Sequence, residues 1–327
     1  MAQAAVKNNE NAMACKTQIC PHLLRYYQLP PREKQKHLET PAAQFLFQGL
    51  PSDVAGMLWK GFLAGEFGEN ISGWQEVVVN YFQENSRIIP ELIKNPGTFT
   101  MLEKMYHFEP VEGVIDNYFL MSMAGGQALY NRYQAVTARV SRDVTEILRQ
   151  SGQCLMIDVG SGPGRNAIDL CIQHPEFNGA IHIDCIDINP EAIAKGEKLV
   201  AEYDIKQIKF VQKSMARLQQ RYPGNVDYGI LIGILCGLTR QDRVILLSVL
   251  QSYFRKGAKL VVASLLDQMA KDDLLCAYIL RETAGWGLQF PPLGELKGVF
   301  KEAGWGYEGS FQEEPTRFYE IGVGIAL

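Results

Sequence analysis

The hydrophobic pattern of the chain changes character near residue 150. Between about residues 21 and 150, apolar side chains recur at helical spacing in short segments that prolines such as Pro51, Pro90 and Pro110 interrupt. The longest helical pattern covers residues 127–149. After residue 150, short apolar runs alternate with helical segments, which is typical of parallel strands joined by helices. The pattern therefore predicts a flexible tail at residues 1–20, a helical region at 21–150 and an α/β domain at 151–327.

The predicted strands and helices of the second region define a fold class. Strands are expected at residues 154–159, 181–188, 208–211, 228–232, 259–265, 305–311 and 317–325. Helices are expected at residues 167–172, after Asn189, from Thr239 to about Phe254, and at residues 269–283 and 293–303. No helix separates the last two strands, so one of them should run antiparallel. We therefore expect a Rossmann-like, doubly wound, mostly parallel seven-stranded sheet with one antiparallel strand near the C-terminus.

Charge and composition exclude several classes of protein. The 327 residues include 32 basic and 36 acidic side chains, giving a net charge of -4. Neither half is a basic module, so nucleic acid is not an expected partner. No apolar run approaches the roughly 20 residues of a membrane span. The odd count of seven cysteines and the polar N-terminus without an apolar leader lead us to expect a cytoplasmic protein with free thiols.

A glycine-rich turn after the first predicted strand is the most informative motif. It reads Asp158-Val-Gly160-Ser-Gly162-Pro-Gly164 and leads into a helix. In open parallel sheets, ligands bind outside the carboxyl ends of the strands, and glycines let the backbone approach them closely. Asp158 could face a cation there. Asp187, which closes the next strand, could accept hydrogen bonds from both hydroxyls of a ribose.

Two classes of cofactor fit such a turn. Residues 162–167 satisfy a weaker form of the dinucleotide fingerprint G-x-G-x-x-G/A. However, a carboxylate at Asp158 would repel a pyrophosphate, whereas it would attract a ligand with a positive head group. The residues therefore favour a cationic cofactor over a nicotinamide dinucleotide.

The same turn resembles the first motif of class I S-adenosylmethionine-dependent methyltransferases. Residues 230–235 are similar to the family's fourth strand with the turn that lines the methyl site, and residues 293–305 to its last helix. The chain departs from the family in lacking an acid after the third strand, so Ser214 or a backbone group must serve the adenine. It also has Cys236 where many members have a histidine. The resemblance implies cofactor contacts at Asp158, Gly160, Gly162, Gly164, Asp187, Ile188, Ser214, Met215 and Gly233.

The methyl acceptor is less well marked than the cofactor. Tyr118, Tyr130, Arg132 and Tyr133 are candidate substrate residues, although helical packing would also explain the aromatic ones. His107 is the one histidine considered as a general base. Cys15 and Cys20 lack a second pair at zinc-binding spacing, and we predict no metal site. Several O-methyltransferases have a helical N-terminal region of similar length, so residues 21–150 are expected to cap the site or form a homodimer surface.

The sequence thus predicts a methyltransferase that moves the methyl group of S-adenosylmethionine in line to a small-molecule acceptor. Residues 233–236 do not resemble the Asn/Asp-Pro-Pro-aromatic box of enzymes that methylate DNA amino groups, which disfavours base methylation. Three alternatives remain open: methylation of a protein, a nicotinamide-dependent oxidoreductase, and a non-catalytic module that binds the cofactor. The residues do not distinguish O-, N- and C-methylation.

Overall fold

The structure is a computed structural model of the chain. It describes residue 83, then residues 86–95, 99–107, 111, 116, 119–120, 123–218, 221–273, 276–277 and 279–327. The predicted tail at residues 1–20 and most of the predicted helical region before residue 86 lie outside the described residues. None of the described helices combines the length and apolar character needed to cross a membrane.

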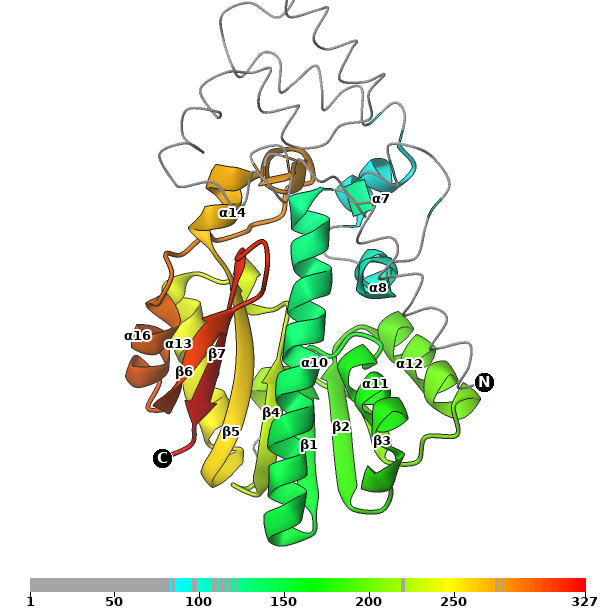
Figure 1. The fold of residues 1–327 in the computed structure, drawn as a ribbon, viewed down its shortest axis with the longest axis vertical. Helices are drawn as coiled ribbons and strands as arrows, with labels where there is room; N and C mark the ends of the chain where they lie inside the picture. The colour runs from blue at the N-terminus through cyan, green and yellow to red at the C-terminus, as the bar shows by residue number, and fades with distance from the viewer. Residues whose placement is uncertain are drawn as a thin grey trace, which may run out of the picture. The chain divides into compact units, whose positions relative to one another are not determined.

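Seven strands form one sheet in the order β3-β2-β1-β4-β5-β7-β6 (Figure 1). Their bounds are β1 Cys154–Val159, β2 Ile181–Asp187, β3 Ile208–Gln212, β4 Val226–Leu231, β5 Phe254–Leu265, β6 Gly306–Gln312 and β7 Tyr319–Ile325. Strands β1 to β5 pair in parallel, whereas β7 runs antiparallel to both β5 and β6. This confirms the predicted Rossmann-like sheet with one antiparallel strand near the C-terminus.

Helices connect the strands at the predicted places. Their bounds are α7 Ile88–Lys94, α8 Phe99–His107, α10 Ala124–Ser151, α11 Arg165–Gln173, α12 Pro190–Glu202, α13 Arg240–Gln251, α14 Asp267–Asp272 and α16 Glu295–Glu302. The Asn189 side chain accepts a hydrogen bond from the Glu191 amide (2.9 Å), and the Thr239 hydroxyl accepts one from the Asp242 amide (3.2 Å). Both caps satisfy amides that a helix start leaves without a partner, so the sequence located these two starts correctly.

Apolar side chains fill both faces of the sheet. Helix α10 lies against one face of the sheet (Figure 1), where its Val136, Val140 and Val144 pack with residues of α11 and the central strands. On the other, residues of α13 and α16, such as Leu247 and Phe300, pack with the alternate positions of the same strands. Because parallel strands are buried on both faces, the alternating pattern of a half-exposed strand is absent, and the continuous run of residues 154–159 follows from this layering.

Two predicted elements differ from the observed ones by more than three residues. Strand β5 begins at Phe254 rather than residue 259, because its first residues after Phe254 are exposed and polar and carry no apolar signal. The helix predicted at residues 269–283 is not continuous: α14 ends at Asp272, and a π-helical turn covers Ile279–Thr283. The carboxylate of Asp273 accepts a hydrogen bond from the Cys276 amide (3.1 Å), and such local bonding by an aspartate competes with helix continuation.

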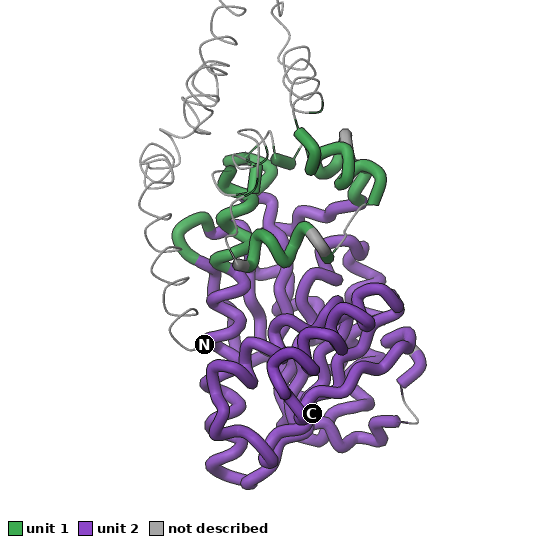
Figure 2. The backbone as a smooth tube through the Cα atoms, turned by 90° about the vertical axis from the view of Figure 1, so that its right-hand side faces the viewer, with its two compact units in different colours: residues 1–131, 269–286, 314–316 green, residues 132–268, 287–313, 317–327 purple. Residues whose placement is uncertain are grey.

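The chain divides into two compact units (Figure 2). One contains residues 1–131, 269–286 and 314–316; the other contains residues 132–268, 287–313 and 317–327, including the whole sheet. The second unit thus begins inside α10, before the expected domain boundary at residue 150. The expected role of residues 21–150 as a cap or dimer surface stays a prediction.

Candidate active site

The glycine turn joins the end of β1 to the start of α11. Gly160, Gly162 and Gly164 have φ angles of 67°, 55° and 74°, a region that residues with a Cβ rarely adopt. The Gly160 amide donates to the Ile186 carbonyl (2.8 Å), and the Gly164 amide donates to the Ser161 carbonyl (3.0 Å). These bonds hold the turn at the carboxyl ends of β1 and β2, where ligands bind in open parallel sheets.

Gly160 is also required by close packing. A Cβ built on this residue would lie 2.5 Å from Cδ1 of Ile234, which belongs to the loop after β4. No side chain can occupy that space unless Ile234 moves. The contact therefore couples the glycine turn to the loop after β4.

Asp187 lies beside the turn, as its place at the end of β2 predicts. One carboxylate oxygen accepts a hydrogen bond from the Gly162 amide (2.7 Å), and the other accepts one from the Asn189 amide (2.9 Å). The Lys213 amide donates to the Asp187 carbonyl (3.0 Å), which brings the segment after β3 to the same edge. A half-buried carboxylate thus stands where three strand ends meet.

Asp158 places a second carboxylate at this edge, and it is buried. Its side chain is 1% exposed, and its Oδ2 accepts no hydrogen bond from the part of the chain that the structure describes. Burial, followed by the nearby charge of Asp187, raises the pKa of Asp158 to about 7. A buried acceptor of this kind stabilises a cationic or hydrogen-bond-donating ligand beside it.

The remaining predicted cofactor residues lie on the loops that follow β2, β3 and β4. Ile188 is 68% exposed, directly after Asp187, so it offers an apolar surface beside an acid. Ser214 is exposed and precedes the short helix Met215–Arg217, where Met215 is half-buried. Gly233 has a φ of 85°, and nothing lies within 4 Å of a Cβ built on it. The structure thus brings all nine predicted residues to the carboxyl edge of β1–β4.

Comparison with known proteins gives a match to this part of the chain. The family profile described as a methyltransferase domain matches residues 150–291, which include the glycine turn and Asp187. Residues 150–291 therefore form a methyltransferase domain. Its cofactor is the methyl donor S-adenosylmethionine.

Solved structures share the fold of the methyltransferase at low sequence identity. A possible exported protein from Bordetella parapertussis has a TM-score of 0.64 and 15% identity, over 91% of this chain and 99% of that one. Magnesium protoporphyrin IX methyltransferase from Synechocystis PCC 6803, solved with bound S-adenosylhomocysteine, has a TM-score of 0.52 and 14% identity, over 73% of this chain and 98% of that one. No curated protein matches the sequence.

The predicted substrate residues of the methyltransferase are less exposed than a binding role suggests. Arg132 is buried, with its guanidinium 4.7 Å from the centre of the Tyr319 ring. The Tyr133 hydroxyl donates to the Asp169 carboxylate, and Tyr130 is buried in the other compact unit. Tyr118 and the side chain of the suggested base His107 lie outside the described residues. The substrate role of the four residues and the role of His107 as a base stay predictions.

Three residues near the site were not anticipated from the sequence. Asn166, in the first turn of α11, has a buried Oδ1 that accepts no hydrogen bond from the described residues. Ile234 packs on Gly160, and Arg243 is buried below the loop after β4. Only Arg243 carries a sequence signal, because it lies on an otherwise apolar face of α13, beside Leu247 and Leu250.

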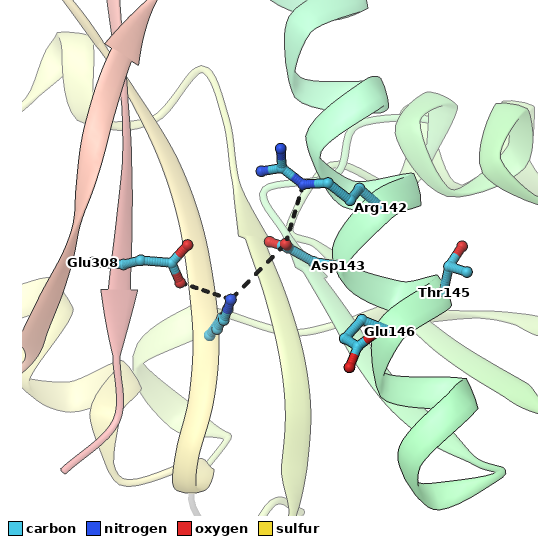
Figure 3. A pocket seen from close by; sticks show the side chains of 6 residues that line it. Arg142, Asp143, Thr145, Glu146 and Glu308 are labelled. Atoms are coloured by element: carbon cyan, nitrogen blue, oxygen red, sulfur yellow. Dashed lines mark ion pairs between the residues drawn. The ribbon is translucent and has the colours of Figure 1, made fainter.

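A separate pocket of about 540 Å³ contains none of the predicted cofactor residues (Figure 3). Four of its charged lining residues pair with one another: Lys259 lies 2.7 Å from Glu308 and 3.9 Å from Asp143, and Arg142 lies 3.9 Å from Asp143. The buried Arg139 also pairs with Asp143 (2.6 Å). These ion pairs join α10, β5 and β6, so a structural role accounts for the charged residues that line the pocket.

Proposed function

We propose that the chain transfers a methyl group from S-adenosylmethionine to a small-molecule acceptor. The observation that carries the proposal is the pair of carboxylates at the glycine turn, Asp158 with an unpartnered buried oxygen among the described residues and Asp187 at the end of β2. Two acids beside this turn repel a pyrophosphate and attract a cationic ligand. This supports the methyl donor over a nicotinamide dinucleotide.

The predicted site residues fit the parts of S-adenosylmethionine. Asp158 would face its positive methionine end, and Asp187 would accept hydrogen bonds from the ribose hydroxyls. The exposed side chain of Ile188 would cover one face of the adenine, with Ser214 and Met215 on the following loop. Gly233, where a side chain would be free to project, leaves the loop after β4 open toward the methyl group.

The chain's part in the reaction is chiefly to bind, orient and exclude water. When bound, the cofactor supplies a methyl group on a positively charged sulfur, which is already a good leaving group. Holding the acceptor in line with that methyl group lowers the barrier without a covalent enzyme intermediate. Burial raises the pKa of the Cys236 thiol, which argues against a nucleophilic role for the one cysteine in the loop after β4.

The net charge of the chain and the sequence of the loop after β4 support the proposal that the acceptor is a small molecule. The net charge of -4 and the lack of a basic half disfavour a nucleic acid substrate. The loop after β4 reads Gly-Ile-Leu-Cys and lacks the aromatic box used on DNA bases. Residues 21–150 would supply the cap over the acceptor or a homodimer surface.

Two measurements test this function. Calorimetry should detect S-adenosylhomocysteine binding and no comparable binding of NADH; the reverse result rejects the cofactor assignment. A cell extract is then incubated with the protein and donor labelled on the methyl carbon, and products are separated by size. Label in the small-molecule fraction supports the proposal. Label only in protein contradicts the acceptor class, and cofactor binding without any labelled product indicates a non-catalytic module.

A further inference from the structure

Arg243 is an arginine inside an apolar cluster. It is the fourth residue of α13 and its side chain is 1% exposed; the other buried residues of this helix, Leu247 and Leu250, belong to the apolar core. Burial lowers its pKa from the usual range of arginine, although the guanidinium remains charged. A charge is costly to bury unless several hydrogen bonds compensate, so the contacts of this side chain identify its role.

Those contacts converge on the loop after β4. The Arg243 Nε donates to the carbonyls of Leu235 (2.9 Å), the first residue of the short helix Leu235–Gly237, and Leu238 (3.0 Å), the residue that follows this helix. Its Nη1 donates to Glu295 at the start of α16 (3.0 Å) and lies 3.4 Å from the Ser264 hydroxyl near the end of β5. One side chain thus ties the loop to a helix start and a strand end.

The loop held by Arg243 contacts the glycine turn. Ile234, the residue before Leu235, fills the space where Gly160 would carry a Cβ. The same loop is also held through Cys236, whose carbonyl accepts a hydrogen bond from the Gln289 amide (2.8 Å). A shift of the Leu235 backbone would therefore move Ile234 relative to Gly160.

We propose that Arg243 is a positioning residue for the cofactor and methyl site: it holds residues 234–238 so that Ile234 keeps the glycine turn in its binding geometry. The inference rests on the proposed function, because it assigns the turn to the cofactor. Arg243 itself does not contact the turn. Its removal would leave two carbonyls of the loop without their donor, and the loop would gain alternative positions.

The chain offers a matched control on the same helix. Arg240 also joins α13 to α16, through two hydrogen bonds to Glu302 (2.8 and 2.5 Å), but it is exposed and, among the described residues, it makes no hydrogen bond to the loop. Arg240→Met therefore removes a helix-to-helix ion pair and leaves the loop contacts in place. Comparing it with Arg243→Met separates loop positioning from the joining of the two helices.

Two readouts on the full chain decide the proposal. In Arg243→Met, amide hydrogen exchange in residues 234–238 should accelerate by about tenfold while exchange in β1 and α11 stays unchanged. The dissociation constant for S-adenosylhomocysteine, measured well below the unfolding midpoint, should rise by roughly fivefold or more. Arg243→Lys should recover part of both effects, and Arg240→Met should show neither.

Two results would overturn the inference. One is wild-type affinity in Arg243→Met despite the faster loop exchange, and the other is faster exchange throughout the core, which indicates general destabilisation. If Arg243→Met does not fold, Arg243→Lys gives the same test, because a lysine keeps the charge but cannot donate to both carbonyls in the same geometry. Absence of S-adenosylhomocysteine binding in the wild-type protein would instead contradict the proposed function.

Discussion

At the scale of single residues, Asp158 combines a position at the ligand edge of the sheet with almost complete burial. Its position at the end of a buried strand predicts an acid at the ligand edge, and the structure confirms that position. The 1% exposure depends on packing by residues distant in the chain, which no local pattern encodes. The same applies to Ile234 and Arg243, whose contacts with Gly160 and Leu235 arise only when the strands pair.

The raised pKa of Asp158 makes stability depend on pH. Its pKa is about 7 in the folded chain and about 4 in an unfolded one. The folded state holds this proton more tightly, so stability is highest below about pH 4 and decreases as the pH rises through about 7. Asp158→Asn removes this titration. We expect the variant to be more stable than the wild type at about pH 8, by up to about 4 kcal/mol, with the difference vanishing near pH 4.

Urea unfolding of both proteins between about pH 4 and pH 8 measures this difference. A difference that does not change with pH would contradict the titration of Asp158. Binding supplies a second check, because a cationic ligand favours the ionised carboxylate. The affinity of the wild type for S-adenosylmethionine should increase as the pH rises through about 7, and that of Asp158→Asn should not.

Gly160→Ala tests the contact between the glycine turn and the loop after β4. The added Cβ would lie 2.5 Å from Ile234, so we expect a loss of stability on the order of 1–3 kcal/mol and weaker S-adenosylhomocysteine binding. Gly179→Ala is the control: its φ of 81° imposes a similar backbone cost, and nothing lies within 4 Å of its Cβ. Adding Ile234→Ala to Gly160→Ala should restore part of the stability. Equal losses in the two glycine variants would show that the contact is unimportant.

Asp187→Ala tests the proposed ribose ligand. The carboxylate also orients the Gly162 amide, so its loss removes ligand contacts and loosens the turn. Binding of S-adenosylhomocysteine should weaken by about 1–3 kcal/mol in calorimetry, the cost of hydrogen bonds to a charged acceptor. Glu202→Ala, an exposed acid at the end of α12, should leave the affinity unchanged. An unchanged affinity in Asp187→Ala would contradict the proposal that this carboxylate binds the ribose.

At the scale of secondary-structure elements, the sequence located those with local signals. Buried runs mark β1 and β2, and the capping residues Asn189 and Thr239 mark the starts of α12 and α13. The prediction was wrong where side-chain hydrogen bonds compete with the backbone bonds of a helix. The side chain of Asp273 bonds to the nearby amide of Cys276, so the helix predicted through residues 269–283 is interrupted, although its apolar spacing is helical.

At the scale of the whole molecule, α10 is part of the compact unit that contains the sheet. The second unit begins at residue 132, and Val136, Val140 and Val144 are 0–2% exposed in its core. The helical pattern of residues 127–149 predicted this buried face, but periodicity alone does not say which unit a helix joins. A division at residue 150 would therefore separate the sheet from three of its own core residues.

Two fragments of the chain test this division. Residues 151–327 lack α10, whereas residues 124–327 keep it. Burial of a valine contributes about 1.5–3 kcal/mol, so losing three removes about 5 kcal/mol or more. That loss is comparable with the 5–15 kcal/mol by which a typical domain is stable. We expect calorimetry to show a cooperative transition only for 124–327, which should also bind S-adenosylhomocysteine. Because both fragments retain residues 269–286, a cooperative transition in 151–327 would show that the sheet folds without α10 and that the domain begins after residue 150.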